Sequence, residues 1–243
     1  MKKTLAFLLK SQLVQCFFRK DRSAWFIALA VVACACASAP LRYGGADSYK
    51  NFAELSAANT EGRDYSCEVY DRGSKITVFA VHGGDIELTT SRVARKLAGA
   101  EFNLYIFNGW LQKESRKLHM TSTHFDDPRA IGLSTGAVLG VSVHAQLEPG
   151  RWVCVGGLNK AAAEMTASGL RAAGFSAETP CALNPGVSPQ NISNRASAGG
   201  VQLEISLQLL KGLESSPPDL TKFTEAVRNS VLDYLNTMQG EKK

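Results

Sequence analysis

The sequence predicts an α/β fold, with an open, largely parallel twisted sheet flanked by helices in a single domain. Apolar runs rich in β-branched residues recur along the chain, and segments of helical composition separate them. With 243 residues, 45% hydrophobic and 20% charged, the composition is close to that of an average globular protein. These values exclude collagen, a coiled coil and wholesale disorder, and no internal repeat or low-complexity tract interrupts the pattern.

The first expected strand is 75–81, Lys-Ile-Thr-Val-Phe-Ala-Val, which Gly73 and the pair Gly83-Gly84 bound as they would a buried strand. Further runs of the same type predict four more strands at 103–107, 137–144, 151–155 and 201–206. Helical composition predicts helices at 49–58, 91–100, 160–173, which Gly174 would end, and 219–238, which is amphipathic.

The positive charge of the chain is concentrated at its N-terminus. The sequence has 27 basic and 22 acidic residues, and six of the basic but only one of the acidic residues lie in 1–36, which leaves 21 of each in the rest. The neutral remainder has no basic stripe and no nucleic-acid motif, so nucleic-acid binding is not expected. We expect a signal peptide at 1–36, a linker with a short helix at 37–63, and a catalytic α/β domain at 64–243.

The N-terminal segment has the three parts of a secretory signal peptide: a basic stretch ending at Arg22, the apolar run 24–33, and small residues up to Ala39. Val31-Val32-Ala33-Cys34 also resembles a bacterial lipobox, in which Cys34 would carry a lipid. The expected location is therefore outside the cytosol, as an envelope lipoprotein or a secreted protein. Cleavage near Ala37 or Ala39 without a lipid, or an anchor that is never cut, are the alternatives.

Export would permit a disulfide bond among the cysteines of the domain, Cys67, Cys154 and Cys181. Cys154 with Cys181 is the first pair to test, and buried free thiols are the alternative. No Cys-x-x-Cys spacing occurs, which argues against a cysteine zinc site.

Four polar residues at the strand exits could form a catalytic zinc site. His82 and Glu87 follow the first strand, with Gly83-Gly84 between them to permit a tight turn, and His144 ends the third strand. Two histidines and a glutamate are a standard zinc set, and Glu204, flanked by Leu203 and Ile205, suits a general base. Taken singly, three of them have a structural interpretation: His82 as a loop histidine, His144 as a hydrogen-bonded residue at the sheet rim, and Glu204 as an edge residue that points to solvent.

Four ordered motifs within about 64–214 resemble the poly-gamma-glutamate hydrolase family, which is related to the zinc carboxypeptidases. They are 80–87 (Ala-Val-His-Gly-Gly-Asp-Ile-Glu), 118–128 (Leu-His-Met-Thr-Ser-Thr-His-Phe-Asp-Asp-Pro), Val143-His144, and 191–195 (Asn-Ile-Ser-Asn-Arg) followed by 199–206 (Gly-Gly-Val-Gln-Leu-Glu-Ile-Ser).

This resemblance implies a carboxypeptidase-like fold with one zinc ion per chain. By the same likeness, His82, Glu87 and His144 match the zinc ligands and Glu204 matches the general base. Asn194 and Arg195 would lie near a substrate carboxylate, for which arginine offers a two-pronged donor. His124 would contact the substrate or support a residue that binds the metal, or else it would be part of a turn. The chain departs from the family pattern at Ala145-Gln146, where a glycine is common, which bears on pocket shape.

The function expected from these features is that of a zinc metallohydrolase of amide bonds, acting on a γ-glutamyl polymer or peptide. One substrate is poly-γ-glutamate, and another is the γ-glutamyl linkage of peptidoglycan stem peptides. A non-catalytic surface lipoprotein that retains the fold is a hypothesis of a different class.

Overall fold

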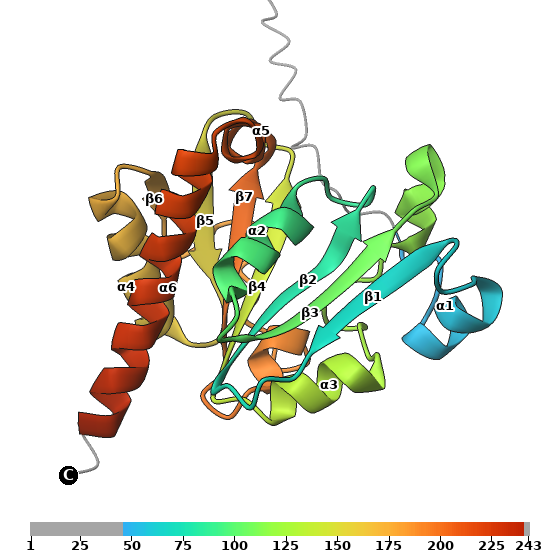
Figure 1. Ribbon diagram of the computed structural model, residues 1–243, viewed down its shortest axis with the longest axis horizontal. Coiled ribbons are helices and arrows are strands. Elements are labelled where there is room, and N and C mark those ends of the chain that lie inside the picture. The colour runs from blue at the N-terminus through green and yellow to red at the C-terminus, as the bar shows by residue number, and fades with distance from the viewer. Residues whose placement is uncertain (1–45, 241–243) are drawn as a thin grey trace, which may run out of the picture. The chain divides into compact units, whose positions relative to one another are not determined.

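The computed structural model describes residues 46–240, which form a seven-stranded sheet with helices on both faces (Figure 1). The order of the strands across the sheet is β1-β3-β2-β4-β7-β5-β6. The strands are β1 Tyr65–Tyr70, β2 Ile76–Gly84, β3 Asn103–Gly109, β4 Leu139–Gln146, β5 Trp152–Gly156, β6 Ser176–Glu178 and β7 Gly200–Ser206. The helices are α1 Phe52–Ala58, α2 Thr90–Ala98, α3 Pro128–Thr135, α4 Lys160–Ala172, α5 Leu207–Ser215 and α6 Pro217–Gly240, with 3-10 turns η1 Gln112–Leu118 and η2 Ile192–Arg195.

The centre of the sheet is parallel and its margins are mixed. Strands β3, β2, β4 and β7 pair in parallel, whereas β1 pairs antiparallel with β3, and β5 pairs antiparallel with β7. The predicted α/β fold with a largely parallel sheet is therefore confirmed. The carboxyl ends of the four central strands lie at one edge of the sheet, where polar side chains can converge.

Alternation along the strands divides the core into two layers. In β7, Val201, Leu203 and Ile205 point to the face covered by α2, α4, α5 and α6. The residues between them are polar and buried, and they face the side on which η2 packs. An aromatic cluster built around Phe79, Phe107 and Phe125 fills that side near β2 and β3. The period-two pattern thus buries a polar row in the sheet, and this row includes Glu204.

All five predicted strands are present, and the strands missed by sequence lie at the two edges of the sheet. β6 has only three residues, and β1 ends in the half-exposed pair Val69 and Tyr70, so neither shows a long apolar run. Helix α3 was also missed, although Asp127 caps its N-terminus and Pro128 opens it, which is a recognised start signal. Helix α5 follows β7 directly, with Ser206 as its cap.

The region predicted to be a linker with a short helix packs onto the domain from Asp47 onward. Helix α1 buries Phe52 and Leu55 in the aromatic layer. The ring of Phe52 packs edge to face against Tyr65 and Phe107, with ring centroids 6.1 and 6.2 Å apart. The backbone N–H of Phe52 also donates to Asp126. In the described residues this segment is therefore part of the folded domain rather than a tether before it.

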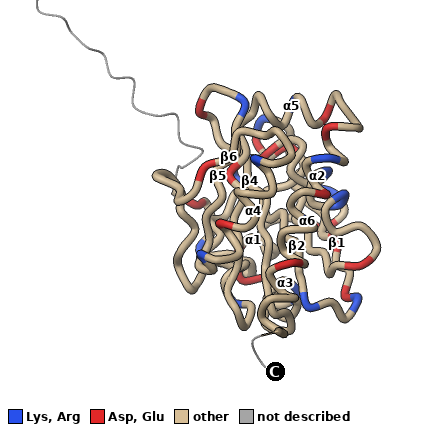
Figure 2. The backbone as a smooth tube through the Cα atoms, turned by 90° about the vertical axis from the view of Figure 1, so that its left-hand side faces the viewer, with Lys and Arg blue, Asp and Glu red and all other residues tan. Residues whose placement is uncertain are grey.

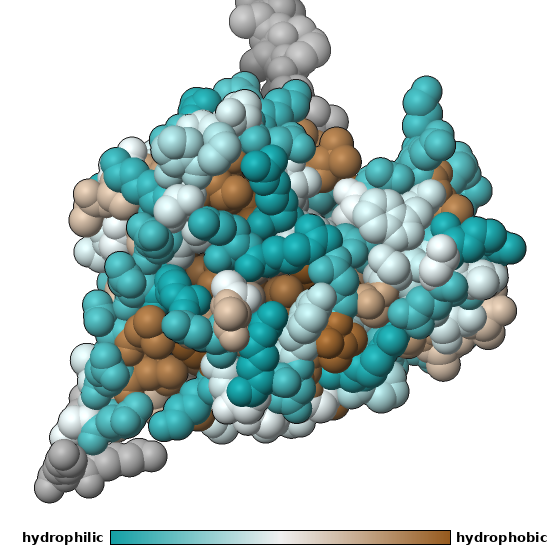
Figure 3. All heavy atoms as spheres, in the orientation of Figure 1, coloured by the Kyte–Doolittle hydropathy of each residue, from teal (hydrophilic) through white to brown (hydrophobic). Residues whose placement is uncertain are grey.

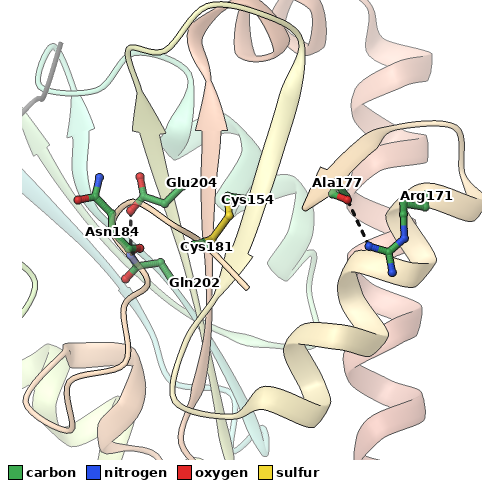
Figure 4. The surroundings of a disulfide bond; sticks show 7 residues. All are labelled: Cys154, Arg171, Ala177, Cys181, Asn184, Gln202 and Glu204. Carbon is green, nitrogen blue, oxygen red and sulfur yellow. Dashed lines mark hydrogen bonds between the residues drawn. A yellow bond between two sulfur atoms is a disulfide. The ribbon is translucent and has the colours of Figure 1, made fainter. Parts of the chain in front are cut away.

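A disulfide bond joins Cys154 in β5 to Cys181 in the chain that follows β6 (Figure 4). The bond ties this chain segment, which runs on to η2, to a strand next to β7. Cys67 is a free thiol, and burial raises its pKa to about 12. The disulfide predicted first among the cysteines of the domain, Cys154 with Cys181, is therefore the one that forms.

The predicted signal peptide and the lipobox at Cys34 lie outside the described residues. Within 46–240, none of the helices is both long and apolar enough to cross a membrane. Basic and acidic residues are interspersed along the described chain, including several basic residues on α2 (Figure 2). Hydrophilic side chains cover much of the face that carries α2 and α6, with apolar patches between them (Figure 3).

Replacing both Cys154 and Cys181 with serine should lower the free energy of unfolding by about 3 kcal/mol. The reason is that the bond closes a loop with a sequence separation of 27 residues, which restricts the unfolded chain. Urea unfolding of the two proteins measures the difference, and wild type with reductant should match the double variant. Equal stability with and without the bond would contradict this account.

Candidate functional site

A pocket of about 440 Å³ opens at the carboxyl ends of β2, β4 and β7. Four of the residues predicted from the sequence to be functional line it: His82, Glu87, His144 and Glu204. Their exposed fractions are between 2% and 6%, so each polar side chain is removed from bulk water. Burying such polar side chains costs free energy unless they are paired with one another or serve a function.

The turn after β2 brings His82 and Glu87 together. The backbone N–H of Glu87 donates to the His82 carbonyl at 2.8 Å, and this bond closes the turn. Gly83 and Gly84 make it possible: a Cβ at Gly83 would overlap Ser91 Oγ, and Gly84 has φ +66°. The strand also bulges here, because the four residues from Ala80 to Gly83 lie opposite only three residues of β3, Ile106 to Asn108.

Register places His144 beside Glu204. The two residues are direct partners in the parallel ladder of β4 and β7, and both belong to the polar row of the sheet. The backbone N–H that follows His144, on Ala145, donates to Glu87 Oε2 at 2.8 Å. The Glu87 carboxylate is thereby fixed at the end of β4, although its own backbone belongs to the turn after β2.

His82, Glu87 and His144 converge on one point. His82 Nδ1 lies 3.0 Å from Glu87 Oε1 and 3.2 Å from His144 Nδ1, and His144 Nδ1 lies 3.7 Å from Glu87 Oε2. The two imidazole rings are inclined at 60° to each other. Two ring nitrogens and the Glu87 carboxylate thus lie together, with Oε1 nearest His82 and Oε2 nearest His144, an arrangement that suits a cation.

The other nitrogen of each imidazole is already engaged. His82 Nε2 lies 2.8 Å from the carbonyl oxygen of Met120, which can only accept, so this nitrogen carries the proton. His144 Nε2 lies 3.3 Å from the Ser122 hydroxyl. These outer contacts set the ring orientations and turn Nδ1 of both rings toward Glu87 and toward each other.

The two buried glutamates are in opposite electrostatic situations. Burial alone would raise the pKa of Glu87, but the charge of His82 and hydrogen bonds from His144 and His82 hold that pKa well below its usual range. Burial and then the charge of Glu87 raise the pKa of Glu204 well above its usual value, against opposing hydrogen bonds from Gln202 and Asn184. One carboxylate suits a cation ligand and the other suits a proton acceptor.

Two residues without a role in the sequence-based prediction complete the site. His119 stacks on His82 with ring centroids 4.1 Å apart and a 28° angle, and His82, Glu87 and His119 offer ligand atoms within 4.8 Å of one another. Burial and the neighbouring His82 lower the pKa of His119 to about 3. His119 Nδ1 lies 3.3 Å from Asp47 Oδ1, and Asp47 also accepts the N–H of Thr121 at 3.0 Å. Asp47 sits in a weakly patterned polar segment, so no local signal could have identified it.

Three residues predicted to contact substrate do not line the pocket. The amide of Asn194 is fully used inside the protein, since it accepts from Leu158 N–H and donates to the carbonyls of Gly186 and Ser188. Arg195 Nε donates to the carbonyl of Gln190 at 3.3 Å. His124 is 58% exposed and lies against Asp47 at 2.8 Å. Motif position alone could not show that Asn194 is a scaffold for the loop before η2.

The fold and the site define an α/β protein with a candidate metal centre at the carboxyl edge of its sheet. The poly-gamma-glutamate hydrolase family model matches residues 49–218. The chain therefore belongs to the poly-gamma-glutamate hydrolase family, a family of hydrolases.

Relatives and solved structures agree with this assignment. UPF0714 protein YndL of Bacillus subtilis (strain 168) is 38% identical over 170 residues, which are 69% of this chain and 67% of YndL. The SPbeta prophage-derived UPF0714 protein YoqZ of the same organism is 37% identical over 67% of this chain and 60% of its own length.

A bacteriophage poly-gamma-glutamate hydrolase superposes with a TM-score of 0.73 at 29% identity, over 79% of this chain and all of that one. Zinc-free apo YndL superposes with a TM-score of 0.71 at 33% identity, over 78% of this chain and 99% of that one.

Substituting alanine for Gly83 should destabilise the protein by about 1–3 kcal/mol, because the added methyl group must displace Ser91 and Asn108. Gly132→Ala is the matched control. Position 132 lies inside α3 with nothing within 4 Å of an added Cβ, so this change should be neutral or stabilising by up to about 1 kcal/mol. Denaturant unfolding compares the two, and equal effects would show that the turn after β2 does not need its glycine.

Proposed function

We propose that this protein is a zinc-dependent amidohydrolase that cleaves γ-glutamyl amide bonds, with poly-γ-glutamate as the substrate. The observation that carries the proposal is the convergence of His82 Nδ1, His144 Nδ1 and the Glu87 carboxylate within 3.0 to 3.7 Å. Membership of the poly-gamma-glutamate hydrolase family supplies the bond class. YndL, a relative whose structure is described as zinc-free, makes zinc the natural metal to test.

The donor set fits zinc in both chemistry and spacing. Zinc binds histidine nitrogen and carboxylate oxygen at about 2.0–2.2 Å, so two ligand atoms in a tetrahedral site are about 3.3 Å apart. The distance between the two Nδ1 atoms, 3.2 Å, and the distances from them to the Glu87 carboxylate oxygens, 3.0 and 3.7 Å, bracket that value. The contacts of His82 Nε2 with Met120 and of His144 Nε2 with Ser122 act as the outer support that metal-binding histidines need.

His144 suits the third ligand position better than His119. A metal lies in the plane of the imidazole that binds it, and the 60° inclination of the His82 and His144 rings lets their in-plane lone pairs converge. His119 is instead stacked on His82 at 28°, so its in-plane lone pairs run alongside those of His82. We assign His119, held by Asp47, to the pocket wall beside the metal.

Glu204 is the proposed general base. It lies beside His144 in the sheet, is only 6% exposed, and accepts a hydrogen bond from Gln202 at 2.8 Å. Zinc, when bound, would polarise the scissile carbonyl and lower the pKa of a water molecule. Glu204 would take the proton of the attacking water and deliver it to the leaving nitrogen, and its raised pKa brings it closer to the working pH.

Neutral donors are the proposed contacts for the free α-carboxylates of a γ-linked substrate. No Lys or Arg is among the described residues that line the pocket. The hydroxyl segment 121–123 and the loop 184–188 form its walls. Arg195, which was predicted to hold such a carboxylate, is not among the lining residues, and its Nε donates to the carbonyl of Gln190.

An exported setting suits this substrate, and the Cys154–Cys181 disulfide supports it, since such bonds persist outside the cytosol. Peptidoglycan stem peptides carry the same linkage, and a binding module without activity is the remaining alternative. Incubation with poly-γ-glutamate and, separately, with γ-glutamyl stem peptides distinguishes them. Release of shorter polymer supports the proposal, cleavage of stems alone redirects it to the envelope, and no cleavage of either contradicts it.

The purified protein should contain about one zinc per chain, and His144→Ala should lose it. His119→Ala is the matched control and should retain zinc, because we place that ring beside the metal rather than on it. Elemental analysis after dialysis measures both. Zinc loss in His119→Ala with retention in His144→Ala would overturn the assignment of the third ligand.

Glu204→Gln should reduce hydrolysis by about 10²-fold or more while zinc is retained, because the amide keeps the shape but cannot accept the proton. Turnover with poly-γ-glutamate is measured alongside zinc content. Wild-type turnover in this variant would remove Glu204 from the reaction.

A further inference from the structure

The chain between Cys181 and η2 contacts the buried side chain of Gln202 in β7 at two points, the Asn184 carbonyl and the Asn191 amide. Gln202 is 4% exposed, and it precedes Glu204 by two positions on the same face of the strand. Gln202 Nε2 donates to Glu204 Oε1 at 2.8 Å and to the backbone carbonyl of Asn184 at 3.1 Å. One amide group therefore contacts both the buried carboxylate and the wall of the pocket (Figure 4).

The orientation of the Gln202 amide is set by backbone groups that can act only as hydrogen-bond donors or only as acceptors. The backbone N–H of Ser193 donates to Asn191 Oδ1 at 3.2 Å, so Asn191 must present its Nδ2 on the other side. Asn191 Nδ2 donates to Gln202 Oε1 at 2.7 Å. Gln202 must then turn its Nε2 toward Glu204 and the Asn184 carbonyl, which can only accept. Three successive hydrogen bonds, from Ser193 N–H to Asn191, from Asn191 to Gln202 and from Gln202 to Glu204, therefore fix the Gln202 amide as a donor to Glu204.

The pocket loop is packed directly onto the same amide. Gly186 has φ +64°, and a Cβ there would lie 2.6 Å from two atoms of the Gln202 amide and 2.9 Å from the third. Asn184, at φ +48°, is a non-glycine residue in the left-handed region. The loop is anchored at its start by the Cys154–Cys181 bond, and Cys154 is the ladder partner of Glu204 on β5. The pocket loop 184–188 and the Glu204 carboxylate therefore both rest on the Gln202 amide of β7.

We propose that Gln202 is a positioning residue, which holds the Glu204 carboxylate and the 184–188 wall of the pocket in one fixed arrangement. This inference rests on the proposed function, because it assigns the way in which the proposed general base is aimed. Gln202 holds Oε1 of Glu204, and the side chain of Asn184, in the same pocket loop, also hydrogen-bonds this carboxylate. Without a donor at Gln202, the carboxylate loses its hydrogen bond at Oε1 and is freer to rotate, and the Asn184 carbonyl loses its hydrogen bond to β7.

Two substitutions of similar size separate positioning from space filling. Gln202→Met fills the site without a donor. Asn191→Asp leaves Gln202 intact but presents an acceptor where Asn191 had a donor, which should turn Nε2 of Gln202 away from Glu204. We expect kcat on the γ-glutamyl substrate to fall by about tenfold or more in both, with zinc content unchanged. Gln208→Met, on the exposed side of α5, is the matched control and should keep wild-type kcat.

A second readout does not depend on activity. In crystals of metal-free Gln202→Met, the Glu204 carboxylate should be rotated or present in more than one orientation, whereas wild type should keep one. A single wild-type orientation in this variant, or wild-type kcat in both variants, would overturn the inference. If wild-type protein with zinc hydrolyses no γ-glutamyl substrate, the proposed function fails, and the orientation of Glu204 still decides the role of Gln202.

Discussion

The site depends on one constraint, which is that the Glu87 carboxylate must lie buried between His82 and His144. A carboxylate removed from water needs partners, and it has two imidazoles and the N–H of Ala145. The rest of the local structure serves this convergence. The glycine turn shortens the path from His82 to Glu87, and the parallel pairing of β2 with β4 brings His144 to the same edge. A change in the turn or in this register would separate the three groups.

A second layer of contacts surrounds that centre, and its parts come from distant segments. Asp47, at the start of the described chain, holds His119 and the N–H of Thr121, which lie more than 70 residues further on. On the opposite side, the disulfide and Gln202 hold the pocket loop against β7. Both walls of the pocket are therefore fixed by long-range contacts, while the strands fix the convergent groups.

Sequence reasoning succeeded where local pattern determines position. The apolar run before Gly83-Gly84 and the alternation around Glu204 identified strands, and the strand-exit rule then identified His82, Glu87, His144 and Glu204 as pocket residues. It failed where position depends on packing between distant segments. Nothing near Asp47 marks it as a partner of His119. Arg195 belongs to a motif, but its Nε donates to the backbone carbonyl of Gln190. Gln202 could have been found, because it shares the period-two polar row with Glu204.

The most direct measurement of the central claim is an anomalous difference map at the zinc absorption edge, from crystals of the protein grown with zinc. The account predicts one strong peak about 2.0–2.2 Å from His82 Nδ1, His144 Nδ1 and a Glu87 oxygen. A peak bound by His119 in place of His144, or no peak at this centre while zinc is present in solution, would contradict it.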